Sequence, residues 1–177
     1  MDDWTTGFIA FLERNADWLP LIMAVFAAAE TTAFLSFLIP STAILVAGGA
    51  LVATGAVSFW PLWAGATVGA MAGSFFSYWL GWRYGSAVLA MRPLRDHPEM
   101  VTRTRAAFAR YGPGTVFIGH FVTIFRPVVF LLAGASGMRL HRFAFWNVIG
   151  CVAWAYVVPQ LGAFGGDILG WLWSLIP

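Results

Sequence analysis

Long apolar stretches alternate with short polar connections along this chain. Residues 59–82 form one continuous apolar stretch, and residues 143–163 form another. Because each residue of a helix rises by about 1.5 Å, roughly 20 apolar residues cross the hydrocarbon core of a bilayer. The pattern therefore predicts a transmembrane helix over each of these two ranges.

Two further apolar stretches, residues 18–57 and 111–138, are interrupted. The interruptions are charged, ionisable or helix-breaking residues: Glu30, Pro40, His120, Arg126 and Pro127. Non-helical backbone is tolerated at membrane depth only where protein or a water-filled cavity surrounds it. We therefore expect each stretch to form a helical hairpin that enters and leaves the membrane on the same side.

An interrupted stretch followed by a continuous span occurs twice, which indicates an internal repeat. Each span carries two glycines 12 residues apart: Gly69 and Gly81, then Gly150 and Gly162. If both hairpins re-enter, each unit crosses the membrane once and the second unit is inverted. Many transporters place a binding site at the midplane in this way. The predicted fold is a single all-α integral membrane domain, with two opposed re-entrant hairpins plus transmembrane helices in an inverted repeat.

The remaining segments are residues 1–17, 83–110 and 164–177. We expect an interfacial N-terminal helix in the first and a C-terminal segment, too short to be assigned as a span, in the last. Within 83–110, apolar residues recur at helical spacing: Met100, Val101, Ala107 and Phe108. This spacing predicts an amphipathic helix on the membrane surface, with a solvated loop as the alternative.

Composition excludes a soluble protein. The chain is 60% hydrophobic, only 10% charged, and has a mean hydropathy of +0.77. The 52 residues from 31 to 82 contain no charged side chain. No soluble fold of this size has enough interior to bury so much apolar surface. A soluble enzyme, a nucleic-acid-binding protein and a disordered regulator are therefore excluded.

The distribution of charge predicts an orientation. Residues 83–110 contain six arginines and two acidic residues, a net charge of +4, whereas residues 1–17 carry a net charge of −3. Basic residues beside membrane spans remain in the cytoplasm. We therefore expect a multi-pass protein whose 83–110 connection is cytoplasmic.

Glu30 and Arg126 are the candidate functional residues, because each is a charged residue inside an apolar stretch. A carboxylate at the centre of a membrane helix costs about 2.5–3.5 kcal/mol on insertion scales. In one interpretation, Arg126 binds an anionic headgroup and Glu30 is a gate or proton site. In the other, the two form a buried ion pair between the hairpins. The protein can form the ion pair in one state and bind the headgroup in another.

Polar residues near the two breaks are further candidates for substrate binding. His120 precedes Arg126 in the same stretch, and its ordinary titration range suits proton exchange; packing against a backbone carbonyl is the alternative role. Ser41, Thr42 and Thr123 lie beside the breaks, where hydroxyl groups can satisfy freed backbone or hydrate a cavity. Asn147 in the second span is expected to form an interhelical hydrogen bond.

Enzyme motifs receive little support. Residues 134–137 match the GxSG of rhomboid proteases, but neither continuous span carries the histidine that a rhomboid needs. The chain has no lysine for a phosphatidate-phosphatase motif. No grouping of acids, histidines or cysteines predicts a magnesium or zinc site. We therefore expect no enzymatic activity, cofactor or metal.

Several short motifs occur in order over about residues 20–165. They are Glu30 with Ile39-Pro40-Ser41-Thr42, Ala47-Gly48-Gly49, residues 73–85 (GSFFSYWLGWRYG), residues 108–112 (FARYG), residues 117–121 (FIGHF) with Arg126, and residues 147–150 (NVIG). Together they resemble the DedA family, also described as SNARE-associated or VTT-domain proteins. The resemblance implies two opposed re-entrant hairpins and the movement of lipids between leaflets. For a bacterial inner-membrane member it implies undecaprenyl phosphate recycling or phospholipid translocation, linked to the proton-motive force.

The resemblance also assigns residues. The intramembrane acid of the family matches Glu30, and its second essential arginine matches Arg126. The first arginine of the family falls on His120, the intervening proline on Thr123, and a Gly-acid pair on Ser41-Thr42. These departures put proton coupling in doubt and suggest a different headgroup or passive scrambling.

The expected function is therefore a flippase or scramblase for an anionic lipid. The alternatives are a proton or ion exchanger using Glu30 and His120, and a non-transporting membrane scaffold. No nucleic-acid partner is expected. Gly69 and Gly73 form a GxxxG pair, which suits close helix packing within one chain or in a homo-oligomer.

Overall fold

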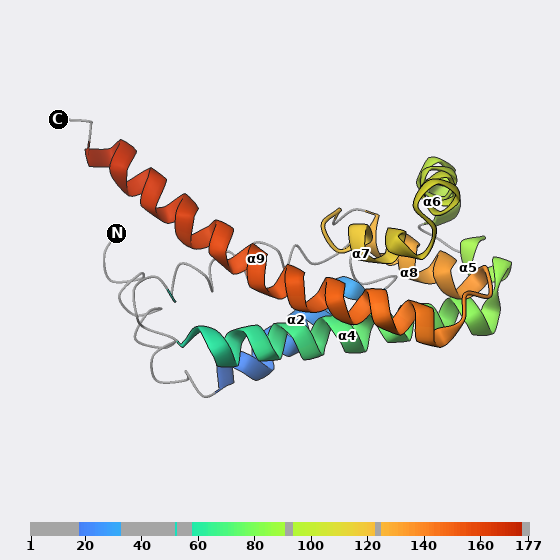
Figure 1. The fold of residues 1–177 in the computed structure, drawn as a ribbon, viewed down its shortest axis with the longest axis horizontal. Coiled ribbons are helices and arrows are strands. Elements are labelled where there is room, and N and C mark those ends of the chain that lie inside the picture. The colour runs from blue at the N-terminus through green and yellow to red at the C-terminus, as the bar shows by residue number, and fades with distance from the viewer. Residues whose placement is uncertain (1–17, 33–51, 53–57, 91–93, 123–124, 175–177) are drawn as a thin grey trace.

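The computed structural model describes residues 18–32, 52, 58–90, 94–122 and 125–174, and every regular element within these ranges is helical (Figure 1). The prediction of an all-α protein is confirmed for this part of the chain. Among the described helices, the part of α9 from Leu140 to Gln160 is both long and apolar enough to cross a membrane. Two shorter apolar helices, Leu19–Thr31 and Arg126–Ala135, accompany it.

Helix α4 (Phe59–Tyr84) corresponds to the first predicted span and is the element on which the other long helices pack. Helix α2 (Leu19–Thr31) lies directly against it. A Cβ atom on Gly65, Gly69 or Gly73 would collide with the main chain of α2 at Pro20, Ala24 and Ala28, respectively. Partner residues advance together in steps of four, so α2 and α4 run parallel. The predicted GxxxG contact therefore lies within one chain.

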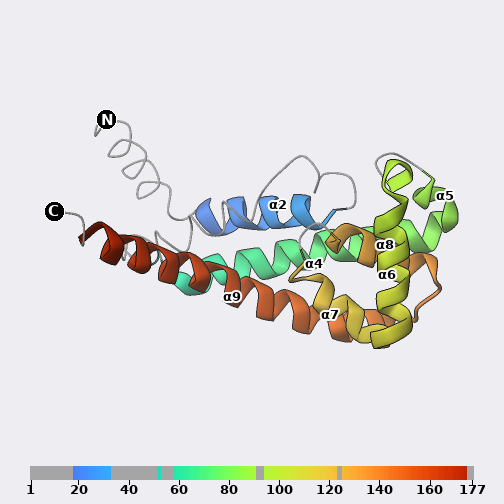
Figure 2. The same ribbon diagram turned by 90° about the horizontal axis from the view of Figure 1, so that it is seen from above.

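Helix α8 (Arg126–Ala135) packs on the same helix, beyond the end of α2 (Figure 2). Gly134 lies against the main chain of Tyr78, and Gly81 lies against that of Leu131. Pro127 occupies the first turn of α8, where its missing amide hydrogen costs no helical hydrogen bond. Consequently α2 and α8 occupy successive positions along α4, and the C-terminal end of α2 meets the N-terminal end of α8.

Helix α9 (Leu140–Ser174) runs antiparallel to α4. Phe59 contacts Tyr156 near one end of the pair, and Phe75 contacts Phe143 near the other. The helix joins the predicted span 143–163 to the predicted tail 164–177, at least as far as Ser174. Neither Pro159 nor the glycines of the tail end it, because membrane helices tolerate both residue types.

Short elements connect α4 to α8: α5 (Ser86–Leu89), η3 (Leu94–Asp96), α6 (Pro98–Tyr111), η4 (Gly112–Gly114) and α7 (Thr115–Gly119). The helix expected within 83–110 is present as α6, which buries only Met100 and Thr104, so the alternative of a solvated loop does not hold over Pro98–Tyr111. Its place on the membrane surface stays a prediction. Both views show α6 lying across the direction of α4 and α9 (Figures 1 and 2). Gly112 ends α6 with a φ of 58°, a conformation that favours glycine.

The second interrupted stretch folds as helix, turn and helix. Helix α7 ends at Gly119, the chain turns through His120–Val122, and α8 begins at Arg126. Most of the first stretch, 18–57, lies outside the described residues, apart from α2 and Val52. Membrane re-entry and the inverted repeat therefore stay predictions.

Tyr78 fastens α4 to the connection between α8 and α9. Its hydroxyl donates a hydrogen bond to the carbonyl of Met138, and its ring stacks on Phe143 at a centroid distance of 4.3 Å. Tyr78→Phe leaves this carbonyl without its donor, so we expect a loss of about 1–2 kcal/mol. Thermal unfolding in detergent measures the change. Tyr84→Phe, at an exposed position of the same helix, should leave the midpoint unchanged.

Candidate functional site

The meeting point of α2 and α8 encloses a buried pair of opposite charges. Nη1 of Arg126 lies 3.6 Å from Oε1 of Glu30, and the two side chains are 0% and 1% exposed. Nη2 of Arg126 donates a hydrogen bond to the backbone carbonyl of His120. The structure therefore brings together the three ionisable residues that the sequence singled out, in the arrangement of the ion-pair interpretation.

The helix ends favour this pairing. Glu30 lies in the last turn of α2, and Arg126 is the first residue of α8. Each charge lies at the unfavourable end of its own helix dipole, but beside the favourable end of the other helix. The ion pair thus offsets the unfavourable interaction of each charge with the dipole of its own helix. The end of α2 is also tightened by Thr31 and Thr32, whose hydroxyls donate to carbonyls of the preceding turn.

Trp154 forms one wall of the arginine site. The guanidinium carbon of Arg126 lies 4.1 Å from the centre of the indole ring, a cation–π contact made stronger by burial. Nε and Nη1 of Arg126 have no hydrogen-bond acceptor among the described residues. Since a guanidinium offers five donors in a planar fork, Arg126 retains capacity for an anionic acceptor.

The imidazole of His120 points toward α9 rather than to the guanidinium. Its Nε2 lies 3.1 Å from Oδ1 of Asn147 and 3.8 Å from Sγ of Cys151. The ring fits because residue 150 is glycine: a Cβ atom there would collide with the imidazole. His120 thus contributes its backbone carbonyl to Arg126 and its side chain to the contact with α9. Asn147, expected to form an interhelical hydrogen bond, instead bonds from α9 to His120 in the turn after α7.

A family model for the VTT domain matches residues 39–164, more than half of the chain. This chain belongs to the VTT-domain (DedA) family. It is 28% identical over 153 residues to the inner membrane protein YabI of Escherichia coli, covering 85% of this chain and 60% of the relative. It is also 33% identical over 140 residues to an uncharacterized membrane protein of Mycobacterium tuberculosis, covering 77% and 62%.

A third relative, an uncharacterized membrane protein of Synechocystis, is 32% identical over 134 residues, covering 74% of this chain and 61% of the relative. This chain therefore spans a little over 60% of the length of such relatives. No solved structure matches it. The family and the names of the relatives indicate a bacterial membrane protein and point to no catalytic family.

Sequence reasoning did not assign Trp154 to the site in this VTT-domain protein, although a signal was available. Asn147, Cys151 and Trp154 follow one another at spacings of four and three, which places them on one face of a helix. That face covers the break between α7 and α8. Helix α4 also contacts the end of α2 beside this site: the Ser77 hydroxyl donates a hydrogen bond to the carbonyl of Thr31 at 2.8 Å.

Three predicted substrate-binding residues, Ser41, Thr42 and Thr123, lie outside the described residues. The rhomboid-like stretch 134–137 has a packing role in the structure. Its Ser136 hydroxyl donates to the carbonyl of Ala133 at 3.0 Å, and Gly134 packs on α4. Within the described ranges, no three His, Cys, Asp or Glu residues are grouped so that they could hold a metal ion.

Proposed function

We propose that this protein moves an anionic lipid headgroup, such as that of undecaprenyl phosphate or an anionic phospholipid, between the leaflets of a bacterial inner membrane. The supporting observation is the buried pair of Arg126 and Glu30 at a junction of two short helices. A guanidinium binds a phosphate through two parallel hydrogen bonds. At 3.6 Å, the contact with Glu30 is an ion pair that a phosphate can replace.

The pair also supplies a gate. When a phosphate takes the guanidinium, the carboxylate of Glu30 loses its ion pair with Arg126 at membrane depth, where a carboxylate is costly. Protonation of Glu30 removes that cost, and release of the proton restores the pair once the lipid leaves. Lipid binding is thereby linked to proton uptake. The basic segment 83–110 faces the cytoplasm in this proposal.

Reconstitution into vesicles tests the proposal. Vesicles carry a fluorescent phosphatidylglycerol, and an impermeant reductant quenches the outer leaflet. With Arg126→Gln, we expect the rate of loss of the protected inner pool to fall to that of protein-free vesicles, because the phosphate loses its buried partner. Arg105→Gln changes an exposed arginine on α6 and should leave the rate within about twofold of the unaltered protein. Equal losses in both variants would refute the role of Arg126.

A proton or ion exchanger that uses Glu30 and His120 is the second candidate, because the Glu30 carboxylate and the backbone carbonyl of His120 both contact Arg126. It is distinguished by proton flux in vesicles made only of zwitterionic lipid, with a pH-sensitive dye inside. Flux that depends on Glu30 but needs no anionic lipid would replace the lipid proposal with the exchanger. Translocation that survives both Glu30→Gln and Arg126→Gln would instead support a scaffold.

A further inference from the structure

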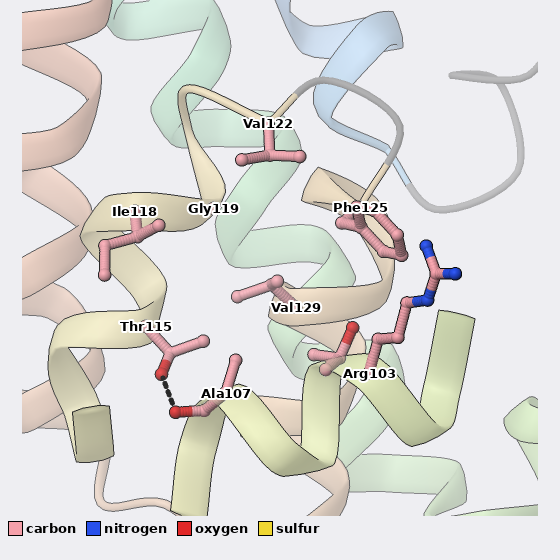
Figure 3. Close-up of a pocket in the computed structure, with 9 residues that line it drawn as sticks. Arg103, Ala107, Thr115, Ile118, Gly119, Val122, Phe125 and Val129 are labelled. Carbon is pink, nitrogen blue, oxygen red and sulfur yellow. Dashed lines mark hydrogen bonds between the residues drawn. The ribbon is translucent and has the colours of Figure 1, made fainter. Parts of the chain in front are cut away.

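A cavity that shares no lining residue with the charged pair lies between α6 and the helix–turn–helix of α7 and α8. It has a volume of about 150 Å³ (Figure 3). Its walls are Ala107 from α6, Ile118 and Val122 from α7 and the following turn, and Phe125 and Val129 from the start of α8. The pocket is open on one side and its lining is almost wholly apolar, so contact with hydrocarbon is favoured there over contact with water. The space therefore suits a short segment of an alkyl chain.

The two hydroxyl groups that line the cavity are already hydrogen-bonded. The Thr115 hydroxyl donates to the carbonyl of Ala107 at 3.0 Å, which is the bond drawn in Figure 3. The Thr104 hydroxyl donates to the carbonyl of Met100 at 2.8 Å. Because neither hydroxyl offers its hydrogen to the interior, water gains little there, and an apolar occupant is favoured.

Arg103 is the charged residue in the cavity lining. Figure 3 shows its side chain extending past Phe125 at one edge, while Ile118 and Thr115 lie at the opposite edge. The Arg103 side chain is exposed, as are those of Arg105 and Arg110 on the same helix. Glu99, one turn earlier, interacts with Arg103, but its Oε1 also lies 3.1 Å from Nδ1 of His97. One arginine therefore lies at the edge of an apolar pocket.

The orientation of α6 and the exposed side chains beside the cavity favour a ligand that comes from the bilayer. Helix α6 lies across the direction of α4 and α9 (Figures 1 and 2), as expected of an amphipathic helix on a membrane surface. Ile118 and Val122, which line the cavity, are 42% and 41% exposed. A lipid beside α6 can therefore place its phosphate at Arg103 and its first methylene groups among these apolar side chains.

We infer that this cavity is a binding site for one hydrocarbon chain of an anionic bilayer lipid, whose phosphate pairs with Arg103. The site is separate from the Glu30–Arg126 pair and binds lipid whether or not that pair translocates it. Bound lipid stabilises the packing of α6 on α7 and α8, so this packing becomes more stable as the anionic lipid content of the membrane rises.

Photolabelling tests binding directly. The full chain is reconstituted in vesicles containing phosphatidylglycerol with a diazirine in the headgroup-proximal half of one acyl chain, and labelled residues are found by mass spectrometry. We expect labels on residues 118–122 and 125–129. A matched vesicle set contains phosphatidylcholine with the same diazirine chain and should label these residues several-fold less, because one arginine near an anionic surface contributes about fivefold in affinity.

Two matched pairs of variants decide the outcome. Ala107→Phe fills the cavity and should reduce the label about tenfold, whereas Ala106→Phe changes the exposed neighbour on α6 and should not. Arg103→Gln should remove the preference for phosphatidylglycerol, whereas Arg105→Gln should retain it. Ala107→Leu, a smaller filling residue, should give an intermediate loss and guards against misfolding of the larger variant.

Equal labelling of Ala107→Phe and Ala106→Phe would overturn the proposed site, as would equal labelling by the two lipids in the unaltered protein. Absence of lipid label at 118–122 and 125–129, with a change in oligomer size on filling the cavity, would assign the cavity to a side chain of a second copy instead. Since labelling measures binding alone, Arg126→Gln should retain it. Loss of translocation and loss of this site are therefore distinguishable.

Discussion

Removal of the Glu30 carboxylate is expected to destabilise the protein by about 3–5 kcal/mol, because Glu30→Ala leaves Arg126 buried without its counter-charge. The remaining contacts, with the carbonyl of His120 and the face of Trp154, do not neutralise the guanidinium. The free energy of unfolding, from denaturant titration in mixed micelles, measures the loss. Glu99→Gln removes an exposed acid from α6 and should leave the free energy of unfolding nearly unchanged, because solvent screens exposed charges.

The double variant Glu30→Leu/Arg126→Met separates a structural role from a functional one. Replacement of a buried ion pair by apolar side chains of similar volume is often neutral or stabilising. We therefore expect the double variant to be at least about 2 kcal/mol more stable than Glu30→Ala. It should nevertheless fail to translocate lipid. Recovery of both stability and translocation would show that the pair serves only packing.

The sequence predicted the helical class and the residues of this pair, because a charge inside an apolar stretch is costly and therefore conspicuous. Glu30 and Arg126 are each the single charged residue in such a stretch, which implied that each pairs with the other or with a ligand. The break before Arg126 was equally visible, since Pro127 fixes a helix start.

Other features were not predictable, because they depend on how helices meet. The direction of the His120 side chain is decided by the absence of a side chain at Gly150 and by the amide of Asn147, on a helix distant in sequence. Similarly, the GxxxG pair predicted a close helix contact but did not identify the helix that makes it. The structure supplies α2 as the partner and extends the contact by one step, to Gly65.

The contact between α2 and α4 gives the second prediction with a large expected effect. Gly69→Val should prevent α2 from packing on α4, because the new Cβ atom would collide with the main chain of Ala24, which cannot rotate away as a side chain can. The cost should exceed the roughly 1–3 kcal/mol of ordinary overpacking, because both helices must separate along their length. Separation also withdraws Glu30 from Arg126, so folding and translocation should fail together.

Ala72→Val provides the matched control, since it adds a β-branched residue at an exposed position of the same helix. Fluorescence-detected size exclusion should show a monodisperse protein for Ala72→Val and an aggregated or degraded one for Gly69→Val. A monodisperse Gly69→Val protein with the melting temperature of Ala72→Val would contradict the packing described. The glycines would then not hold α2 in place, and the alignment of Glu30 with Arg126 would need another cause.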